Sequence, residues 1–146
     1  MTADLPTILI PTCNRSNDLE KLVRYLAISF NRACVRFIVL DGSGKNSEVA
    51  ANRVNCDKYS VDYFNFGSNV SFVERILSGL DEVTSEIVTI LGDDDILDPR
   101  GFGESVSFLQ DNSEYAIAHG QYIGFNYGSQ VGLKYKAAYD SSSIED

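Results

Sequence analysis

The chain alternates short apolar runs with segments whose apolar residues recur at a helical spacing. Two runs rich in β-branched residues, 7–10 and 35–40, predict strands that are buried on both faces of a parallel sheet. Between these two strands, Asn17 and Glu20 predict a capping box at the start of a helix. The apolar residues of that helix fall on one face: Leu19, Leu22, Val23, Leu26 and Phe30. Strand, helix and strand together predict a βαβ unit.

The alternation continues along the chain. It predicts, in order, a short helix over 48–54, a strand over 60–66, a helix over 71–83, a strand over 86–91 and a helix over 98–111. Ser71 and Glu74 predict a capping box for the helix over 71–83. Its apolar residues predict a buried stripe: Phe72, Val73, Ile76, Leu77, Leu80 and Val83. The segment 115–127 predicts a fifth strand or a hairpin, interrupted by Gly120 and Gly124.

This order of elements predicts the fold class and the domain organisation. Alternating β and α segments favour a three-layer α/β/α domain with a mostly parallel sheet. We expect this domain to occupy residues 1–130. Residues 131–146 predict a loose C-terminal tail, because its serine-rich end offers few apolar anchors. In open α/β sheets, ligands bind beyond the carboxyl ends of the strands, and the polar residues of this chain collect after the strands.

Charge and composition exclude several classes of protein. The chain has 12 basic and 21 acidic residues, so a broad nucleic-acid surface is not expected. Residues 1–40 carry a net charge of +2 and residues 41–146 a net charge of −11, which predicts an acidic site in the later part. The spacing of three cysteines and one histidine does not form a zinc motif. No secretory signal or transmembrane segment is evident, which predicts a cytoplasmic protein and leaves peripheral membrane association open.

The strongest chemical signal is the run Asp93-Asp94-Asp95 after the strand over 86–91. Three adjacent carboxylates repel one another unless a cation lies among them, and their hard oxygen atoms suit Mg or Mn. Substrate phosphates commonly complete the shell of such a metal, which predicts a nucleotide diphosphate as ligand. The alternative is a solvated acidic turn in which Asp95 or Asp98 caps the next helix.

Other polar residues lie at the same predicted edge of the sheet. Thr12, Asn14 and Arg15 follow the first strand, and Arg15 suits a phosphate or a carboxylate, although it could simply be solvated. Asp41 can accept hydrogen bonds from a base or sugar, or stabilise the glycine turn that follows it. Arg75 lies on the helix over 71–83, away from its apolar stripe, where it could reach a diphosphate or form a surface ion pair. His119 is expected to be structural.

The order of these motifs resembles family 2 glycosyltransferases of the GT-A type. The resemblance rests on four segments: 7–15, 38–43, 69–75 and 90–95. It implies that Thr12, Asn14, Arg15 and Asp41 hold the nucleotide base, often uracil. It also implies that the acidic DxD-type motif holds Mn or Mg through Asp93 and Asp95, and the diphosphate through Asp93 and Asp94. Leu40 and Gly92 stand where the family commonly has acids.

The resemblance implies transfer of a sugar from a nucleotide-diphosphate donor, with UDP favoured, to an acceptor hydroxyl. The acceptor, whether a saccharide, a lipid or a protein, is not identified, and neither is the general base. Because such domains usually continue for about another hundred residues, the chain is expected to be the donor-binding half, either truncated or a short member whose acceptor site comes from elsewhere. Two alternatives stay open: a Mg-binding module similar to response regulators, and a catalytically silent nucleotide-sugar binding domain.

Overall fold

The computed structural model describes residues 4–120, 123–124 and 136–137. The chain forms two compact units, Met1–Pro99 and Arg100–Asp146. The domain boundary predicted at residue 130 lies outside the described residues.

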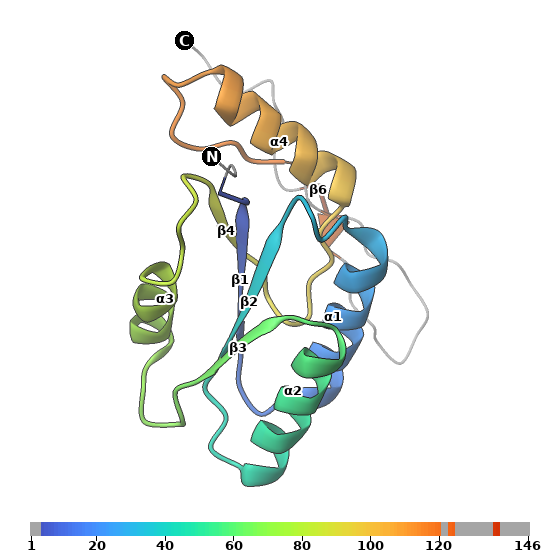
Figure 1. The fold of residues 1–146 in the computed structure, drawn as a ribbon, viewed down its shortest axis with the longest axis vertical. Helices are drawn as coiled ribbons and strands as arrows, with labels where there is room; N and C mark the ends of the chain where they lie inside the picture. The colour runs from blue at the N-terminus through green and yellow to red at the C-terminus, as the bar shows by residue number, and fades with distance from the viewer. Residues whose placement is uncertain (1–3, 121–122, 125–135, 138–146) are drawn as a thin grey trace. The chain divides into compact units, whose positions relative to one another are not determined.

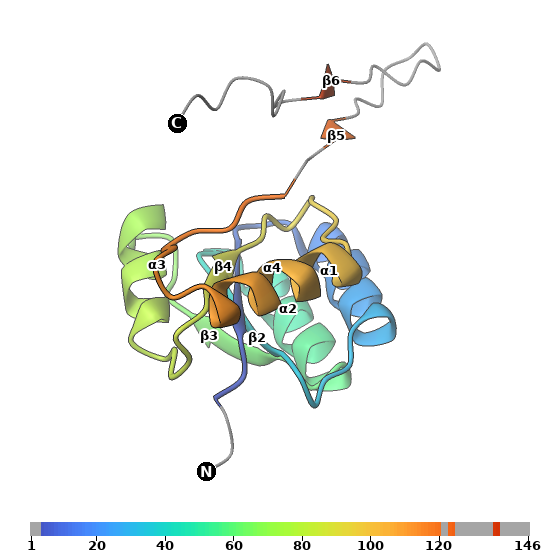
Figure 2. The same cartoon turned by 90° about the horizontal axis from the view of Figure 1, so that it is seen from above.

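The first unit is a four-stranded parallel sheet with helices on both faces (Figures 1 and 2). The strands lie in the order β3-β2-β1-β4, with α1 and α2 on one face and α3 on the other. In chain order the elements are β1 (Thr7–Thr12), α1 (Ser16–Ser29), β2 (Arg36–Asp41), α2 (Asn46–Lys58), β3 (Asp62–Asn65), α3 (Phe72–Leu80) and β4 (Val88–Ile90). The three-layer α/β/α prediction is confirmed for this unit.

The core lies on the two central strands. Residues 8–10 of β1 and 37–40 of β2 are fully buried, because helices cover both faces of the sheet there. On α1 the predicted stripe is confirmed, since Leu19, Leu22, Val23 and Leu26 are buried. Phe30, which ends this helix, packs edge-to-face on Phe37 with 5.6 Å between the ring centroids.

The two predicted capping boxes have different outcomes. At α3, Ser71 Oγ accepts a hydrogen bond from the Glu74 amide at 3.3 Å, and the Glu74 carboxylate accepts one from the Ser71 amide at 2.9 Å. At α1 the prediction is wrong: the helix begins at Ser16, and no side chain of its own N-cap caps it. Instead, the carboxylate of Glu48 on α2 accepts the Ser16 amide at 2.9 Å. The contact between α1 and α2 therefore replaces the local cap.

The predicted buried stripe of α3 is largely wrong. Its apolar residues include four that are 40–63% exposed: Phe72, Val73, Leu77 and Leu80. The buried residues of the helix are Arg75 and Gly79. A Cβ atom at Gly79 would lie 2.5 Å from Leu40 Cδ1, so the glycine lets the helix lie directly on β2. The helix packs on the sheet through Gly79, the buried Arg75 and the partly buried Ile76, and four of its apolar side chains are left exposed.

Helix α4 (Pro99–Asp111) begins at the last residue of the first unit and otherwise belongs to the second unit, in which β5 (Ile123–Gly124) and β6 (Lys136–Ala137) form an antiparallel pair. The strand predicted from residue 115 is not observed over 115–120, and only Ile123–Gly124 of the predicted segment is a described strand. Lys136–Ala137 lies in the predicted loose tail and forms β6. The rest of that tail lies outside the described residues. Among the described residues, no helix combines the length and hydropathy needed to cross a bilayer.

Candidate functional site

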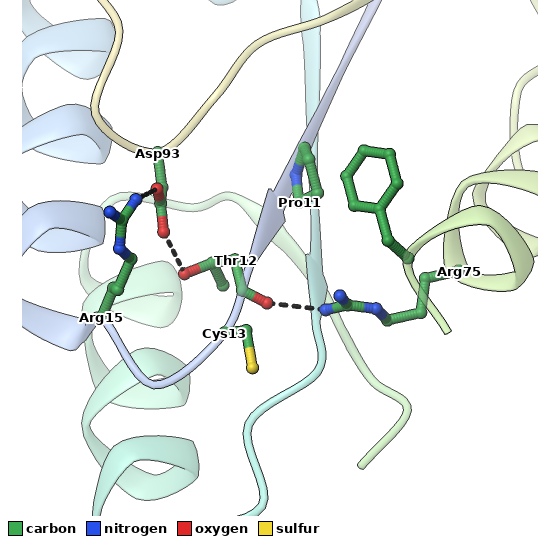
Figure 3. Close-up of a pocket in the computed structure, with 7 residues that line it drawn as sticks. Pro11, Thr12, Cys13, Arg15, Arg75 and Asp93 are labelled. Atoms are coloured by element: carbon green, nitrogen blue, oxygen red, sulfur yellow. Dashed lines mark hydrogen bonds and ion pairs between the residues drawn. The ribbon is translucent and has the colours of Figure 1, made fainter. Parts of the chain in front are cut away.

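A cavity of about 250 Å³ lies at the carboxyl end of β1, inside the first unit. Seven residues line it: Pro11, Thr12, Cys13, Arg15, Phe72, Arg75 and Asp93. Figure 3 shows how β1, the start of α1, α3 and the segment after β4 bring these side chains together. Pockets for whole small ligands usually measure ~300–1,000 Å³, so this cavity is slightly smaller than a usual pocket for a whole small ligand.

Asp93 lies at the centre of the polar contacts in this cavity and is only 6% exposed. Its Oδ2 accepts a hydrogen bond from Thr12 Oγ1 at 2.7 Å, and its Oδ1 accepts one from Arg15 Nη1 at 2.7 Å (Figure 3). The same Arg15 nitrogen lies 3.1 Å from Asp94 Oδ2. Hydrogen bonds from Arg15 to Asp93 and Asp94 raise the pKa of Arg15. The structure therefore joins the loop after β1 to the acidic motif 78 residues later.

Arg75 is buried rather than on the surface. Its Nη1 donates a hydrogen bond to the Thr12 carbonyl at 2.8 Å, and the residue is 7% exposed (Figure 3). The guanidinium lies against Gly42, where a Cβ atom would come within 2.0 Å of Nη1. Its Nε is buried and has no hydrogen-bond partner among the described residues. A cation that is fixed here with an unpaired donor suits an anionic ligand.

Asp41 lies beneath the site and does not line the cavity. Its side chain is fully buried, and its carboxylate accepts three hydrogen bonds: from the Ser43 amide at 2.7 Å, from Asn52 Nδ2 at 2.8 Å and from Tyr63 Oη at 2.6 Å. Burial, together with the hydrogen bond to Asp41, raises the pKa of Tyr63. In this conformation Asp41 connects β2, α2 and β3.

The loop after β1 is attached to this buried network. The backbone N–H of Asn14 donates a hydrogen bond to Ser43 Oγ at 2.8 Å. Asn14 has a φ of 53°, in the left-handed region that asparagine tolerates better than most residues. Cys13 Sγ lies 3.3 Å from the Gly42 carbonyl. The backbone of Asn14 therefore holds the loop that carries Arg15, while its side chain is not among those that line the cavity.

Asp95 is exposed and is not among the residues that line the cavity. A Cβ atom at Gly92 would lie 2.7 Å from Asp95 Oδ2, so the glycine leaves room for this carboxylate against the backbone. Within the described part of the chain, no group of three or more Asp, Glu, His or Cys side chains converges on one point. Magnesium and manganese often use one or two protein carboxylates together with substrate phosphates. The exposed oxygens of the motif fit that kind of metal.

Sequence reasoning missed several residues of the site. Pro11, Cys13 and Phe72 line the cavity, and Asn52 and Tyr63 hold Asp41. Phe72 directly follows Ser71, the N-cap of α3, and a residue at the first position of this helix lies near the end of the sheet. Its spacing instead predicts a place in the core, because it matches the apolar stripe of the helix. Asn52 and Tyr63 carry no local signal, because only the folded sheet brings them to Asp41.

Solved structures show a similar fold. A mannosyltransferase from Pyrobaculum calidifontis, described in complex with GDP-Man and Mn²⁺, matches 73% of this chain at 17% identity with a TM-score of 0.61. TarS of S. aureus matches 88% at 13% identity with a TM-score of 0.62. The chain spans 32% and 23% of the length of these two proteins. The four-stranded unit therefore has the GT-A type of α/β fold.

Sequence comparison gives the family. No curated protein sequence matches the chain. The sequence model of Glycosyl transferase family 2 matches residues 7–139, which is most of the chain and includes every residue that lines the cavity. The chain belongs to glycosyl transferase family 2.

Proposed function

We propose that this chain binds a nucleotide-diphosphate sugar and serves transfer of the sugar to an acceptor hydroxyl. The observation that carries the proposal is the cavity where two arginines, Arg15 and Arg75, meet the acidic residue Asp93 at the carboxyl end of the sheet. A nucleotide sugar presents a diphosphate that arginines bind, and a bound metal would join the diphosphate to a carboxylate. Family membership supports the same activity.

The chemistry of transfer requires that negative charge on the departing diphosphate be stabilised. Arg75 suits this role because its guanidinium is held in place by the Thr12 carbonyl and already desolvated, so little reorganisation accompanies the charge change. Thr12 places its hydroxyl on Asp93 and its carbonyl on Arg75, and so fixes the distance between the acidic and basic sides of the site.

Asp93 and Asp95 are the residues that we propose to hold Mn or Mg, with Asp94 beside them toward the diphosphate. A divalent cation at these carboxylates would supply Lewis-acid stabilisation of the leaving group. The Pyrobaculum mannosyltransferase, described with Mn²⁺, supports a divalent metal in this fold.

The nucleobase of the donor is proposed to lie toward Thr12, Asn14 and Asp41, with UDP as the favoured nucleotide. Asp41 is fully buried and does not line the cavity, so direct contact with a nucleobase requires the residues that cover its carboxylate to move. Because the Pyrobaculum relative is described with GDP-Man, guanine is the alternative base. No general base or acceptor is assigned to the described residues.

Titration calorimetry with UDP and GDP, each with and without Mn or Mg, tests the proposal. We expect one nucleotide to bind in a metal-dependent way. Asp95→Ala should weaken metal-dependent binding by about 100-fold, since even outer-shell partners of metals contribute ~10–100-fold. Asp57→Ala, an exposed carboxylate near the end of α2, is the matched control and should bind like the unchanged chain.

The outcomes separate the remaining functions. If neither nucleotide binds to the folded chain, the donor-site proposal is wrong. Binding together with slow release of sugar from a nucleotide sugar supports an enzyme, because water can replace the missing acceptor. Binding without any such release supports a silent nucleotide-sugar binding domain. Family membership argues against the response-regulator alternative.

A further inference from the structure

The guanidinium of Arg15 stands where a cation of the acidic motif would be expected. One nitrogen, Nη1, bridges two successive carboxylates: it lies 2.7 Å from Asp93 Oδ1 and 3.1 Å from Asp94 Oδ2. Figure 3 shows the contact with Asp93. The other oxygen of Asp93 is taken by the Thr12 hydroxyl at 2.7 Å. Both oxygens of Asp93 are therefore already in use before any ligand enters.

The two partners differ in how freely they can move. Asp93 is 6% exposed and fixed by Thr12, whereas the side chain of Arg15 is 49% exposed and lies in the loop before α1. A buried carboxylate without a counter-charge is strongly unfavourable, so Asp93 needs a cation at all times. Arg15 can leave, but only when another cation takes its place.

We propose that Arg15 is an internal counter-ion that is exchanged during donor binding. In the absence of ligand, Arg15 neutralises Asp93 and Asp94. When a divalent cation and the nucleotide bind together, Arg15 leaves these carboxylates and moves to the diphosphate. This inference rests on the proposed donor site and adds an order of events to it.

The exchange links the metal and the nucleotide energetically. A divalent cation alone must displace Arg15, whose charge then has no anion beside it, so binding of metal by itself is weak. The diphosphate supplies the missing anion, and each ligand therefore strengthens the other. Such coupling is reciprocal and typically amounts to ~5–150-fold in affinity. Arg15 therefore keeps the acidic motif from binding cations when no nucleotide sugar is bound.

Binding of Mn²⁺ without nucleotide, followed by the electron paramagnetic resonance signal of the free ion, tests the inference. We expect Arg15→Ala to bind Mn²⁺ several-fold more tightly than the unchanged chain, because the competing cation is gone, and Arg15→Lys to lie between them. Arg24→Ala removes an exposed arginine of α1 and is the matched control. The enhancement of Mn²⁺ binding by UDP or GDP should be smaller in Arg15→Ala.

Melting in EDTA and in Mn²⁺ supplies a second readout that does not depend on nucleotide. Arg15→Ala should melt lower than the unchanged chain in EDTA, because Asp93 loses its counter-charge, and should gain more from Mn²⁺. Arg15→Gln, which keeps a donor without the charge, should show the same gain. A metal effect that is equal in all variants would show that Arg15 does not compete with the metal.

The two arms keep this inference apart from the proposed function. Equal or weaker Mn²⁺ binding by Arg15→Ala overturns the exchange, and absence of Mn²⁺ binding in every variant overturns it as well. If a nucleotide still binds in those cases, the donor-site proposal stands without the exchange. Tighter Mn²⁺ binding by Arg15→Ala, with no nucleotide bound by any variant, supports the counter-ion and contradicts the donor site.

Discussion

Two glycines beside the site provide space for functional side chains. A Cβ atom at Gly42 would lie 2.0 Å from Arg75 Nη1, and one at Gly92 would lie 2.7 Å from Asp95 Oδ2. Gly92 has no side chain, and this gives room to the carboxylate of Asp95 three residues later. Glycine at each position is explained by the side chain packed against it, which is Arg75 at Gly42 and Asp95 at Gly92.

A double-mutant cycle at Gly42 and Arg75 tests this explanation. Gly42→Ala should lower the free energy of unfolding by about 1–3 kcal/mol, because the new methyl group forces the buried guanidinium from the Thr12 carbonyl. In the Arg75→Ala background the same substitution should cost less, since the obstructing group is absent. Urea unfolding of the four proteins measures the coupling, which should reach ~0.5–3 kcal/mol. Strict additivity would contradict the close contact.

At the scale of elements, helix α1 is positioned by its neighbour α2. Glu48 of α2 accepts the Ser16 amide at the first turn of α1, which directly follows the loop bearing Arg15. Hydrogen bonds from Ser16 lower the pKa of Glu48. The loop of the site is therefore held by Glu48 from one side and by Ser43 from the other.

Glu48→Ala should loosen the first turn of α1, whereas Glu20→Ala should not. The reason is that Glu48, and not Glu20, accepts a hydrogen bond from the Ser16 amide, which has no partner within the helix. Hydrogen exchange of the Asp18 and Leu19 amides, which bond to the Arg15 carbonyl, measures this loosening. Because the folded pKa of Glu48 is depressed, its contribution is present above the ordinary value of 4.5 and is lost as pH falls through the lower folded value. Faster exchange in Glu20→Ala alone would favour the local capping box.

At the scale of the whole molecule, the three thiols report on folding. Cys13 and Cys34 are exposed and Cys56 is buried, and all three are free. Burial of Cys56, with smaller contributions from Asp41 and Asp57, raises its pKa from 9.0 to about 12. The protonated thiol is therefore favoured by the folded state.

Stability should decline in alkaline solution. The unfolded chain releases the Cys56 proton from about pH 9, while the folded chain keeps it to about pH 12, so the free energy of unfolding falls over that interval. The slope from this thiol is at most about 1.4 kcal/mol per pH unit, and Cys56→Ala should remove this contribution and leave that of Tyr63, whose pKa is also raised. A thiol reagent at pH 8 should modify two cysteines in the folded chain and the third only after unfolding. Rapid modification of all three would contradict the burial of Cys56.

The sequence predicted elements better than contacts. The apolar runs of β1 and β2 and the stripe of α1 are correct, because burial on both faces of a sheet leaves a direct mark on composition. The stripe of α3 is mostly wrong, because a small residue, Gly79, allowed a close approach that periodicity does not record. The prediction for residues 115–120 is also wrong, since apolar spacing alone does not specify a pairing partner.

The sequence by itself determined the alternation of strands and helices, the parallel sheet, and the collection of Thr12, Arg15, Asp41 and Asp93 at strand ends, because these follow from local periodicity and from the direction of parallel strands. Only the tertiary structure decided the roles within that set. It buried Asp41 beneath three donors, buried Arg75 against Gly42, and paired Arg15 with Asp93. The hydrogen bonds of Asp41 with Asn52 and with Tyr63, and that of Arg15 with Asp93, join residues 11, 22 and 78 positions apart, so packing and not local sequence brings these residues together.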